Sequence, residues 1–403
     1  TTLTGSQGLA FDENVPVAET RRPSGACALY VARLTLTDFR SYSRLRLDAA
    51  PGAVVLTGVN GAGKTNLLEA LSFLAPGRGL RRSRLADATR READGEDSAR
   101  TWAVAARIET KDGPVDLGTG LEVKDGGRER RVVHIDGMVE KSQAALADYL
   151  SVQWLTPQMD RLFQEGPSAR RRFLDRLVFG FDPAHAGRVS AYNHAMRERS
   201  RLLCARRREP EWLSALEDTM ASKGVAVAAA RSELAARLGD FCATAPGSFP
   251  RAGIEVCGAL ESWLGEGPAL VAEDKLRAAL ARSREKDGET GGAETGPHKS
   301  DMKVRHLEKG REAEICSTGE QKALLISLVL ASARMQAQDR GTPPLLLLDE
   351  VTAHLDSERR EALFEELEEL GAQAWMTGTD AALFAPLKGN ALFLKVEDSR
   401  ITH

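Results

Sequence analysis

The stretch of sequence that decides the fold is Gly58-Val59-Asn60-Gly61-Ala62-Gly63-Lys64-Thr65. It matches the pattern G-x-x-x-x-G-K-[ST], in which residues without side chains let backbone N–H groups close around a phosphate. A short apolar run, Ala53–Thr57, precedes it, and four leucines follow at helical spacing between positions 67 and 74. A glycine-rich turn can match by chance, but a strand before and an amphipathic helix after are the context of a true match. The sequence therefore predicts a P-loop.

The P-loop prediction assigns roles within the motif. Nine residues are expected to surround the nucleotide phosphates: Gly58, Val59, Asn60, Gly61, Ala62, Gly63, Lys64, Thr65 and Asn66. Lys64 is predicted to reach the β- and γ-phosphate oxygens as a catalytic cation, and the Thr65 hydroxyl to bind Mg²⁺. The helix that begins here presents its positive N-terminus to the same anion. ATP and Mg²⁺ are the predicted cofactors.

A second motif is the apolar run Leu345–Leu348, which ends in the carboxylates Asp349 and Glu350. By itself it is equally compatible with a buried strand whose end lies in water. In a P-loop protein, Asp349 is predicted to hold the metal ion, and Glu350 to orient and deprotonate the attacking water. The pair therefore favours ATP hydrolysis over phosphoryl transfer to a small molecule.

The third motif, Cys316-Ser317-Thr318-Gly319-Glu320-Gln321-Lys322, opens a predicted helix. Ser317 with Glu320 three residues later is a capping box, which any helix can have. The stretch also lies one helix and a short loop ahead of Asp349, where ABC-type ATPases carry a signature sequence that faces the γ-phosphate of the other protomer. We therefore predict that Ser317 and Gly319 contact the nucleotide of a second chain, so that two chains sandwich two ATP molecules.

Two further residues complete the predicted ATPase site. Gln153 lies where the first α/β part passes into a helical region, as the Q-loop glutamine of ABC-type ATPases does, and is predicted to contact Mg²⁺ and water. The alternative is an ordinary polar residue on a strand edge. Asp356 is predicted to lie in a loop that crosses the dimer interface, and its alternative role is the N-cap of the helix that begins at Ser357.

The composition indicates a globular protein. Of 403 residues, 42% are hydrophobic and 28% charged, and 55 Lys and Arg stand against 58 Asp and Glu. No apolar run approaches the ~20 residues that a membrane span needs. Five scattered cysteines without a C-x-x-C pair suit thiols in a reducing cytosol better than disulfides or a zinc site. We therefore expect a cytoplasmic protein without a membrane partner.

Hydrophobic periodicity predicts an α/β fold interrupted by a helical insertion. Strands are predicted near 34–36, 45–47, 53–57, 102–108, 117–123, 133–135, 254–257, 345–348, 374–376 and 392–396, and helices over 66–74, 168–178, 183–208, 210–241, 273–284, 317–334 and 357–370. Residues 29–160 and 296–403 are predicted to form lobe I, and residues 161–295 the mainly helical lobe II. The tract 287–296 is predicted to be a surface linker, and residues 1–28 a poorly ordered extension.

Several stretches outside the nucleotide motifs resemble one family. They are LTDFRSY (36–42), VNGAGKTNLLEAL (59–71), GRGLRR (77–82), WLTP (154–157), GPSARRRFLD (166–175), GPHKSD (296–301) and TGTD (377–380). With the motifs above, they make the chain similar to the RecF family, within the ABC/SMC branch of ATPases, from about Tyr30 to its end. Several of these stretches have no role in generic ABC proteins.

The resemblance implies a fold and a function. The fold is an ABC/SMC-type ATPase head, with a mixed sheet around the P-loop helix, a small antiparallel sheet and an inserted helical lobe. The function is ATP-dependent DNA binding near single-strand/double-strand junctions and gaps, by a homodimer that forms with ATP and reopens after slow, DNA-stimulated hydrolysis. RecA loading with RecR and RecO is implied as well. The alternatives are a transporter energising subunit, which needs a shorter distance between Thr65 and Ser317, and an SMC-like tether, which needs sustained heptads.

DNA contact is predicted from local charge. Residues 161–208 hold twelve arginines and four acidic residues, whereas residues 349–369 hold nine acids and two arginines. The basic region is a candidate phosphate-binding face, with solvated helix surface as the alternative. The candidate DNA-binding residues are Arg81, Arg82, Arg206, Arg207 and Arg208.

Overall fold

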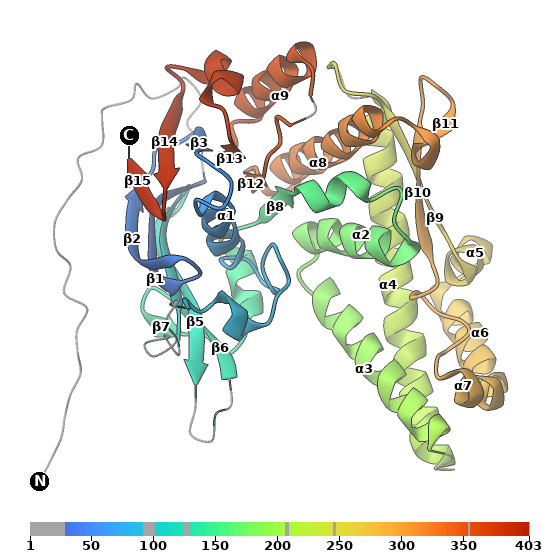
Figure 1. The fold of residues 1–403 in the computed structure, drawn as a ribbon. Helices are drawn as coiled ribbons and strands as arrows, with labels where there is room; N and C mark the ends of the chain where they lie inside the picture. The colour runs from blue at the N-terminus through green and yellow to red at the C-terminus, as the bar shows by residue number, and fades with distance from the viewer. Residues whose placement is uncertain are drawn as a thin grey trace, which may run out of the picture.

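The structure is a computed structural model that describes residues 29–91, 101–123, 127, 129–205, 209–244, 247–353 and 355–402. Its ribbon is shown in Figure 1. The predicted extension, residues 1–28, lies outside the described residues. The predicted α/β fold with a helical insertion is confirmed.

The central sheet carries the P-loop. Its strands lie in the order β15-β14-β3-β13-β12-β8, and all but β15 run parallel to their neighbours. The strands are β3 (Ala53–Thr57), β8 (Val152–Leu155), β12 (Leu345–Leu348), β13 (Ala374–Gly378), β14 (Ala391–Glu397) and β15 (Arg400–Thr402). Every residue of β12 is buried, because a parallel strand in mid-sheet is covered on both faces. The carboxyl ends of β3, β12 and β13 meet at one edge, which gathers the segments that follow them.

A second sheet is antiparallel and lies beside the first (Figure 1). Its strands, in the order β2-β1-β4-β5-β6-β7, are β1 (Tyr30–Phe39), β2 (Tyr42–Asp48), β4 (Ala103–Thr110), β5 (Gly113–Val123), β6 (Glu129–Ile135) and β7 (Met138–Val139). Burial alternates along β4, as expected for a strand with one face in the core. Helix α1 (Lys64–Ser72) shares one hydrophobic core with this sheet and one face of the central sheet.

The other face of the central sheet packs against helices. Its core combines Leu346 and Met376 of the sheet with α8 (Thr318–Arg340), α9 (Ser357–Leu370), α2 (Pro167–Phe181) and α4 (Pro210–Thr244). Helix α8 is buried along most of its length, which explains why its sequence is apolar without a clear polar stripe. The central sheet is therefore packed between two hydrophobic cores. This packing fixes the positions at which the loops after its strands begin.

The inserted helices form a third core around α4. The core holds residues of α3 (His185–Cys204), α5 (Ala259–Glu266) and α6 (Ala269–Arg282), and α7 (Arg284–Thr290) packs against α3. A three-stranded sheet lies beside them, in the order β11-β10-β9, from β9 (Ala252–Cys257), β10 (Asp301–His306) and β11 (Arg311–Glu312). β10 lies beyond the predicted end of lobe II, yet it pairs with β9 inside it. Short 3₁₀ helices complete the described elements: η1 (Leu85–Ala88), η2 (Gln143–Asp148), η3 (Pro157–Arg161), η4 (Ala313–Ile315) and η5 (Ala381–Leu387).

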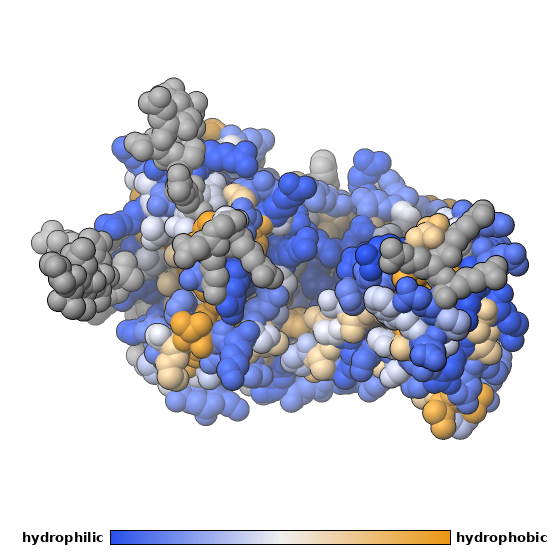
Figure 2. All heavy atoms as spheres, turned by 90° about the horizontal axis from the view of Figure 1, so that it is seen from below, coloured by the Kyte–Doolittle hydropathy of each residue, from blue (hydrophilic) through white to orange (hydrophobic). Residues whose placement is uncertain are grey.

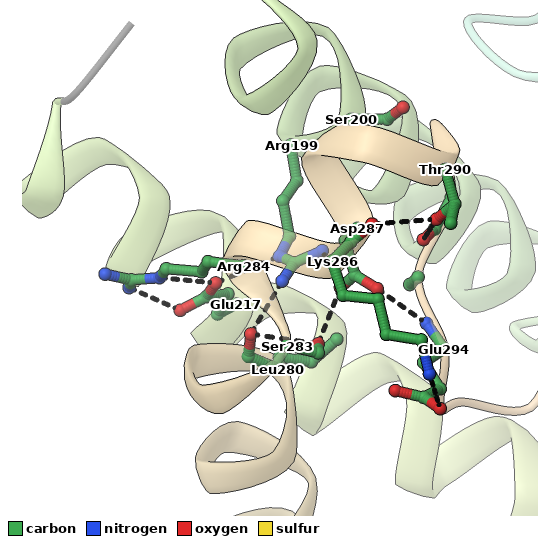
Figure 3. A network of polar contacts seen from close by, with 12 residues as sticks. Arg199, Ser200, Glu217, Leu280, Ser283, Arg284, Lys286, Asp287, Thr290 and Glu294 are labelled. Carbon is green, nitrogen blue, oxygen red and sulfur yellow. Dashed lines mark hydrogen bonds and ion pairs between the residues drawn. The ribbon is translucent and has the colours of Figure 1, made fainter. Parts of the chain in front are cut away.

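A buried polar network replaces the predicted linker (Figure 3). Arg199 of α3 donates to Glu217 of α4 at 2.9 Å and to Asp287 of α7 at 2.7 Å, and all three side chains are at most 2% exposed. Arg284 adds a second ion pair to Glu217 at 2.6 Å. The prediction of a surface linker over 287–296 is therefore wrong at its start. Asp287 neutralises a buried arginine, whereas residues 289–292 that follow it are exposed.

Candidate nucleotide-binding site

The loop between β3 and α1 has the conformation that its glycines permit. Gly58, Gly61 and Gly63 have φ of 148°, 84° and 112°. A Cβ at Gly58 would lie 2.2 Å from the carbonyl oxygen of Val396, and one at Gly63 would lie 2.8 Å from the hydroxyl of Tyr42. Both the backbone conformation and the space therefore exclude other residues at these two positions. Between them, Val59, Asn60 and Gly61 are exposed and Ala62 is buried.

The N-terminus of α1 is open to an anion. Gly63 makes no side-chain cap, and the first turn holds no acidic residue. The backbone N–H groups of Gly63, Lys64 and Thr65 have no protein acceptor in the described part of the chain. Unpaired N–H groups at a helix start carry a partial positive charge. The loop and the helix together therefore form a cradle that fits a phosphate.

Lys64 is held over this cradle. Its side chain is 4% exposed, and its ammonium donates to the carbonyl oxygens of Gly58 at 2.6 Å and Val59 at 3.0 Å. The carboxylate of Glu350 lies 3.8 Å away. The lysine is thus positioned by the same loop that would bind the phosphate, whose negative charge it would neutralise. Its ammonium lies beside the carboxylate of the predicted catalytic base.

Three side chains meet at the carboxyl edge of the central sheet. Asp349 follows β12, and its Oδ1 accepts hydrogen bonds from Thr65 at 2.9 Å and Thr377 at 2.8 Å. Thr377 lies in β13, which pairs with β12 so that Met376 is level with Leu348. The hydroxyl of Thr377 in turn accepts the backbone N–H of Glu350 at 2.8 Å. The TGTD stretch is visible in the sequence, but this bridging role of Thr377 is not; a hydroxyl at the end of the apolar run 374–376 was the available indication.

The backbone at Glu350 is unusual. Its φ is 50°, in the left-handed region that residues with a side chain seldom adopt. The bond from its N–H to Thr377 helps to hold this conformation, and the side chain remains 28% exposed beside Lys64. Strained backbone of this kind is often found where a side chain must point into a site.

Residues of the LTDFRSY stretch form hydrogen bonds to the P-loop and to α1. The Tyr42 hydroxyl donates to the carbonyl oxygen of Gly63 at 3.2 Å, and burial raises the pKa of Tyr42, which keeps it a donor. Asn66 donates to the hydroxyl of Ser41 at 2.9 Å. Arg40 makes two hydrogen bonds to the fully buried carboxylate of Glu69 on α1, at 2.6 and 2.8 Å. This local support explains why a stretch without reactive residues accompanies the motif.

The position of Gln153 corrects the sequence-based prediction. Gln153 lies in the interior of β8, level with Leu346, and only 3% of it is exposed. Its side-chain amide donates to Ser332 of α8 at 2.9 Å. Because Asp349 lies three residues beyond Leu346, Gln153 is remote from the edge where the motifs meet. The glutamine that follows the carboxyl end of β8 is Gln158, exposed in η3.

The start of α8 confirms the capping box. The Ser317 hydroxyl accepts the N–H of Glu320, and the Glu320 carboxylate accepts the N–H of Ser317 at 2.8 Å. An ion pair with Lys309 and these bonds to Ser317 hold the pKa of Glu320 at about 2. Ser317 is exposed, and a Cβ at Gly319 would meet nothing within 4 Å. Neither residue has a hydrogen bond to the P-loop of its own chain among the described residues, and Gly319 is half-buried.

Lys322 links this helix start to the loop after Asp349. Its side chain is 7% exposed, and it donates to the carbonyl oxygen of Ala353 at 2.6 Å. It also lies 3.5 Å from the carbonyl oxygen of Glu350 and 3.4 Å from the Asp160 carboxylate. Burial lowers the pKa of Lys322, while Asp160 and Glu350 oppose that shift. A displacement at the start of α8 is thereby coupled to the backbone that carries Glu350.

Asp356, Arg81 and Arg82 lie at the surface. Asp356 caps α9 by accepting the N–H of Arg359 at 2.8 Å, and its side chain is 59% exposed. Arg81 donates to Asn66 at 2.7 Å and to Glu69 at 2.5 Å, so it is part of the P-loop support. Arg82 lines a cavity that includes none of the P-loop residues 58–65. Arg206, Arg207 and Arg208 lie outside the described residues.

The fold and these motifs can be compared with known proteins. The family model described as RecF/RecN/SMC N terminal domain matches residues 30–396. A curated protein of Mesorhizobium japonicum, named DNA replication and repair protein RecF, is 50% identical over 92% of this chain and 97% of its own length. The chain belongs to the RecF family. A RecF protein of Rhizobium meliloti is 47% identical over 93% of this chain and 99% of its own length.

Solved structures show the same fold. The structure of the recombination mediator protein RecF with ATPrS, described as part of the RecFOR pathway, has a TM-score of 0.79 at 22% identity and covers 93% of this chain and 98% of that one. An Smc head domain with an extended coiled coil from Pyrococcus furiosus has a TM-score of 0.50 at 16% identity and covers 93% of this chain and 95% of that one. The RecF-family fold is thus that of an SMC-type head, as predicted.

Two further observations describe the chain. None of the helices in the described part of the chain combines the length and apolar character that crossing a bilayer requires. In the same residues, no three His, Cys, Asp or Glu side chains are arranged to hold a metal ion. A divalent ion at Thr65 and Asp349 would therefore take its other ligands from phosphate and water, which is how Mg²⁺ is usually bound.

Proposed function

We propose that this RecF-family chain is an ATP-dependent DNA-binding protein of recombinational repair, whose ATP site is completed by a second copy. The observation that carries the proposal is the cluster at the edge of the central sheet. There the phosphate cradle, Lys64, the Thr65–Asp349 pair and Glu350 lie in hydrogen-bonded contact or within 4 Å of a neighbour. This set of groups is what phosphoryl chemistry on a nucleoside triphosphate needs.

Each residue of the cluster has a role in this proposal. The loop N–H groups and Lys64 bind the phosphates and stabilise the negative charge that grows on them. Bound Mg²⁺, held by Thr65 and Asp349, would supply further charge neutralisation. Glu350 accepts a proton from the water that attacks the γ-phosphorus as the bond to ADP breaks. Thr377 positions both carboxylate-bearing residues, and Gln158 replaces Gln153 as the candidate that orients the water.

In this proposal, the second copy contacts the nucleotide with the start of its α8. Ser317 is exposed, Gly319 is half-buried, and neither makes a hydrogen bond to the described P-loop of its own chain. A helix N-terminus with a small, open residue suits an anion that another protomer presents. Lys322 would transmit that contact to the backbone of Glu350. ATP binding would thus drive dimerisation, and hydrolysis would reverse it.

DNA is the proposed partner because of the family resemblance and the clustered arginines. The proposed substrate is a junction of single- and double-stranded DNA, as at a gap. There the dimer would act with RecR and RecO to load RecA. Hydrolysis would be slow and DNA-stimulated, so that the bound dimer persists.

A pair of substitutions tests the ATP site. Glu350→Gln keeps the shape of the side chain but cannot accept the proton, so ATP should still bind while turnover falls about 10²-fold or more. Size-exclusion chromatography with ATP should then show an accumulated dimer. Lys64→Met should abolish both ATP binding and the dimer. Glu365→Gln, at an exposed carboxylate of α9, is the matched control and should behave as the unmodified chain does.

Two outcomes would overturn the proposal. If Glu350→Gln remains monomeric at every ATP concentration, the shared site is wrong. If the unmodified chain with ATP binds gapped duplex no better than blunt duplex, junction recognition is wrong.

A further inference from the structure

A large cavity borders the proposed nucleotide site at Gln158 but includes none of the P-loop residues 58–65. Its volume is about 1010 Å³, and its walls come from the segment 75–82 after α1, from η3, and from α2 and α3 of the insertion. Figure 2 looks into the molecule from below and shows mainly hydrophilic residues around the hollow between its two halves. Pockets for small ligands usually measure about 300–1,000 Å³, so this cavity can hold several charged groups at once.

The charged side chains that line the cavity are mostly positive. Eight arginines line it, against the two carboxylates of Glu165 and Asp175. Asp175 is already neutralised, because it accepts two hydrogen bonds from Arg231, at 2.7 and 2.8 Å, and one from His185 at 2.8 Å. Glu165 is exposed at the rim. Most of the positive charge in the cavity therefore has no carboxylate partner.

The unpaired arginines come from three separate segments. Arg82, Arg172 and Arg197 belong to the segment after α1, to α2 and to α3, and none has an ion pair among the described residues. Partial burial, together with the charges of Arg172 and Arg78, lowers the pKa of Arg82. Like charges held this close repel one another, and a bound anion would relieve that cost.

Arg176 lies deepest among them. It stacks over the ring of Trp154 at 4.6 Å and donates to the carbonyl oxygen of Trp154 at 3.2 Å, while its Nε has no partner. Burial and then the charge of Arg82 lower its pKa to about 9, so it stays protonated at neutral pH. A planar guanidinium fixed on an aromatic ring holds its positive charge in one place beside the cavity, which favours an oxyanion there.

We propose that this cavity, the arginine cleft, is a second phosphate-binding site, separate from the P-loop, for phosphates carried by a single nucleic-acid strand or by a free nucleotide. Guanidinium groups match phosphate oxygens in pairs, and several from different segments match successive phosphates. The volume admits a few nucleotides of one strand but not a double helix. Binding of a nucleic-acid strand in the cleft rests on the proposed DNA function, whereas binding of a phosphate anion there does not.

Binding measurements can separate the two sources. The full chain is used with its P-loop saturated by a non-hydrolysable ATP analogue and Mg²⁺, so that only other sites respond. Calorimetry is run with inorganic pyrophosphate and with 5′-phosphorylated dithymidine. Fluorescence anisotropy is run with an oligothymidylate of about 12 nucleotides, within the usual range for single-strand grooves. A glutamate oligomer of similar charge is the probe for an acidic peptide.

The variant reverses two exposed charges far from the P-loop. Arg172→Glu with Arg197→Glu should weaken binding of at least one phosphate probe about tenfold or more. It should also flatten the salt slope for the strand by about 1.4, or 0.7 for each lost contact. The matched control, Arg282→Glu with Lys303→Glu, changes the net charge equally at exposed positions outside the cleft and should bind as the unmodified chain does. Binding of the ATP analogue should be unchanged in both.

Each outcome decides the proposal. Loss of the oligothymidylate alone identifies a strand, and loss of dithymidine as well identifies a free nucleotide. If every phosphate probe binds the variant within twofold of the unmodified chain, or if only the glutamate oligomer depends on the arginines, the phosphate site is wrong. If no DNA binds at any salt concentration but pyrophosphate still depends on the arginines, the DNA function fails and the anion site stands.

Discussion

Two groups of arginines in the inserted helices differ in their pairing and in their burial. Arg199 lies 1% exposed between Glu217 and Asp287, and a third acceptor, the carbonyl oxygen of Leu280, uses its remaining nitrogen at 2.6 Å. Arg172 lies on α2, and Arg197 lies on α3 two residues before Arg199; both are exposed and have no ion pair in the described residues. The first group can serve only the fold, because its donors are used. The second group lowers the stability of the fold little, because it is exposed, and its guanidinium N–H groups can bind a ligand.

The largest expected effect is at the paired group. Arg199→Met leaves Glu217 and Asp287 buried with fewer partners, and removal of one member of a buried ion pair costs about 3–5 kcal/mol. We expect that loss in the free energy of unfolding, measured by urea denaturation. Arg277→Met is the control, because its pairs with Asp218 and Asp274 are exposed. A loss below about 1 kcal/mol at Arg199 would contradict the distinction between the groups.

An intermediate effect is expected at Asp175, where a paired arginine borders the cleft. Burial opposes the charge of Asp175, but hydrogen bonds from His185 and Arg231 outweigh it, so its pKa lies below the usual value. Asp175→Asn should therefore lose about 1–3 kcal/mol of unfolding free energy at neutral pH. Denaturation curves at a series of pH values measure it, with Asp218→Asn as an exposed control.

The sign of the pH dependence follows from the direction of that shift. A carboxyl with a depressed pKa stabilises the fold above its unfolded value of about 4, and this stability is lost as the pH falls through the folded value. The difference between the unmodified chain and Asp175→Asn should thus be largest near neutral pH and shrink below about pH 4. A constant difference across this range would show that the charge of Asp175 is not what stabilises the fold.

The smallest effect is expected at the unpaired group. Arg172→Gln removes one of several neighbouring positive charges and should change the free energy of unfolding by less than about 0.5 kcal/mol, in either direction. The same urea titration measures it. A loss above about 1 kcal/mol would make Arg172 a structural residue and weaken the case for the cleft.

The nucleotide site was largely predictable because its chemistry is local. The P-loop needs glycines at fixed spacing before a lysine and a hydroxyl, and the structure places Lys64 and Thr65 at the start of α1 as expected. Asp349 was predictable because a buried apolar run must end where its chain returns to polar surroundings. Gln153 was misplaced because its assignment depended on which residue of β8 lies level with Asp349, and register is a property of the sheet.

Other features depended on residues far apart in the chain. Asp287 looked solvated because its neighbours are polar, and only the packing of α3 against α7 shows that it neutralises Arg199. Thr377 gained its role because β13 lies beside β12. The high count of arginines in residues 161–208 was visible, but the sequence could not separate those that are paired from those that are free.

The sequence by itself therefore determined the α/β fold of the RecF type, the glycine loop before α1 and the carboxylates that follow β12, because each is encoded by residues that are neighbours in the chain. The tertiary structure decided which charges are neutralised and which remain open. The physical reason is that pairing and burial depend on contacts between segments such as α2, α3 and the residues after α1, which are brought together only when the cores between them form.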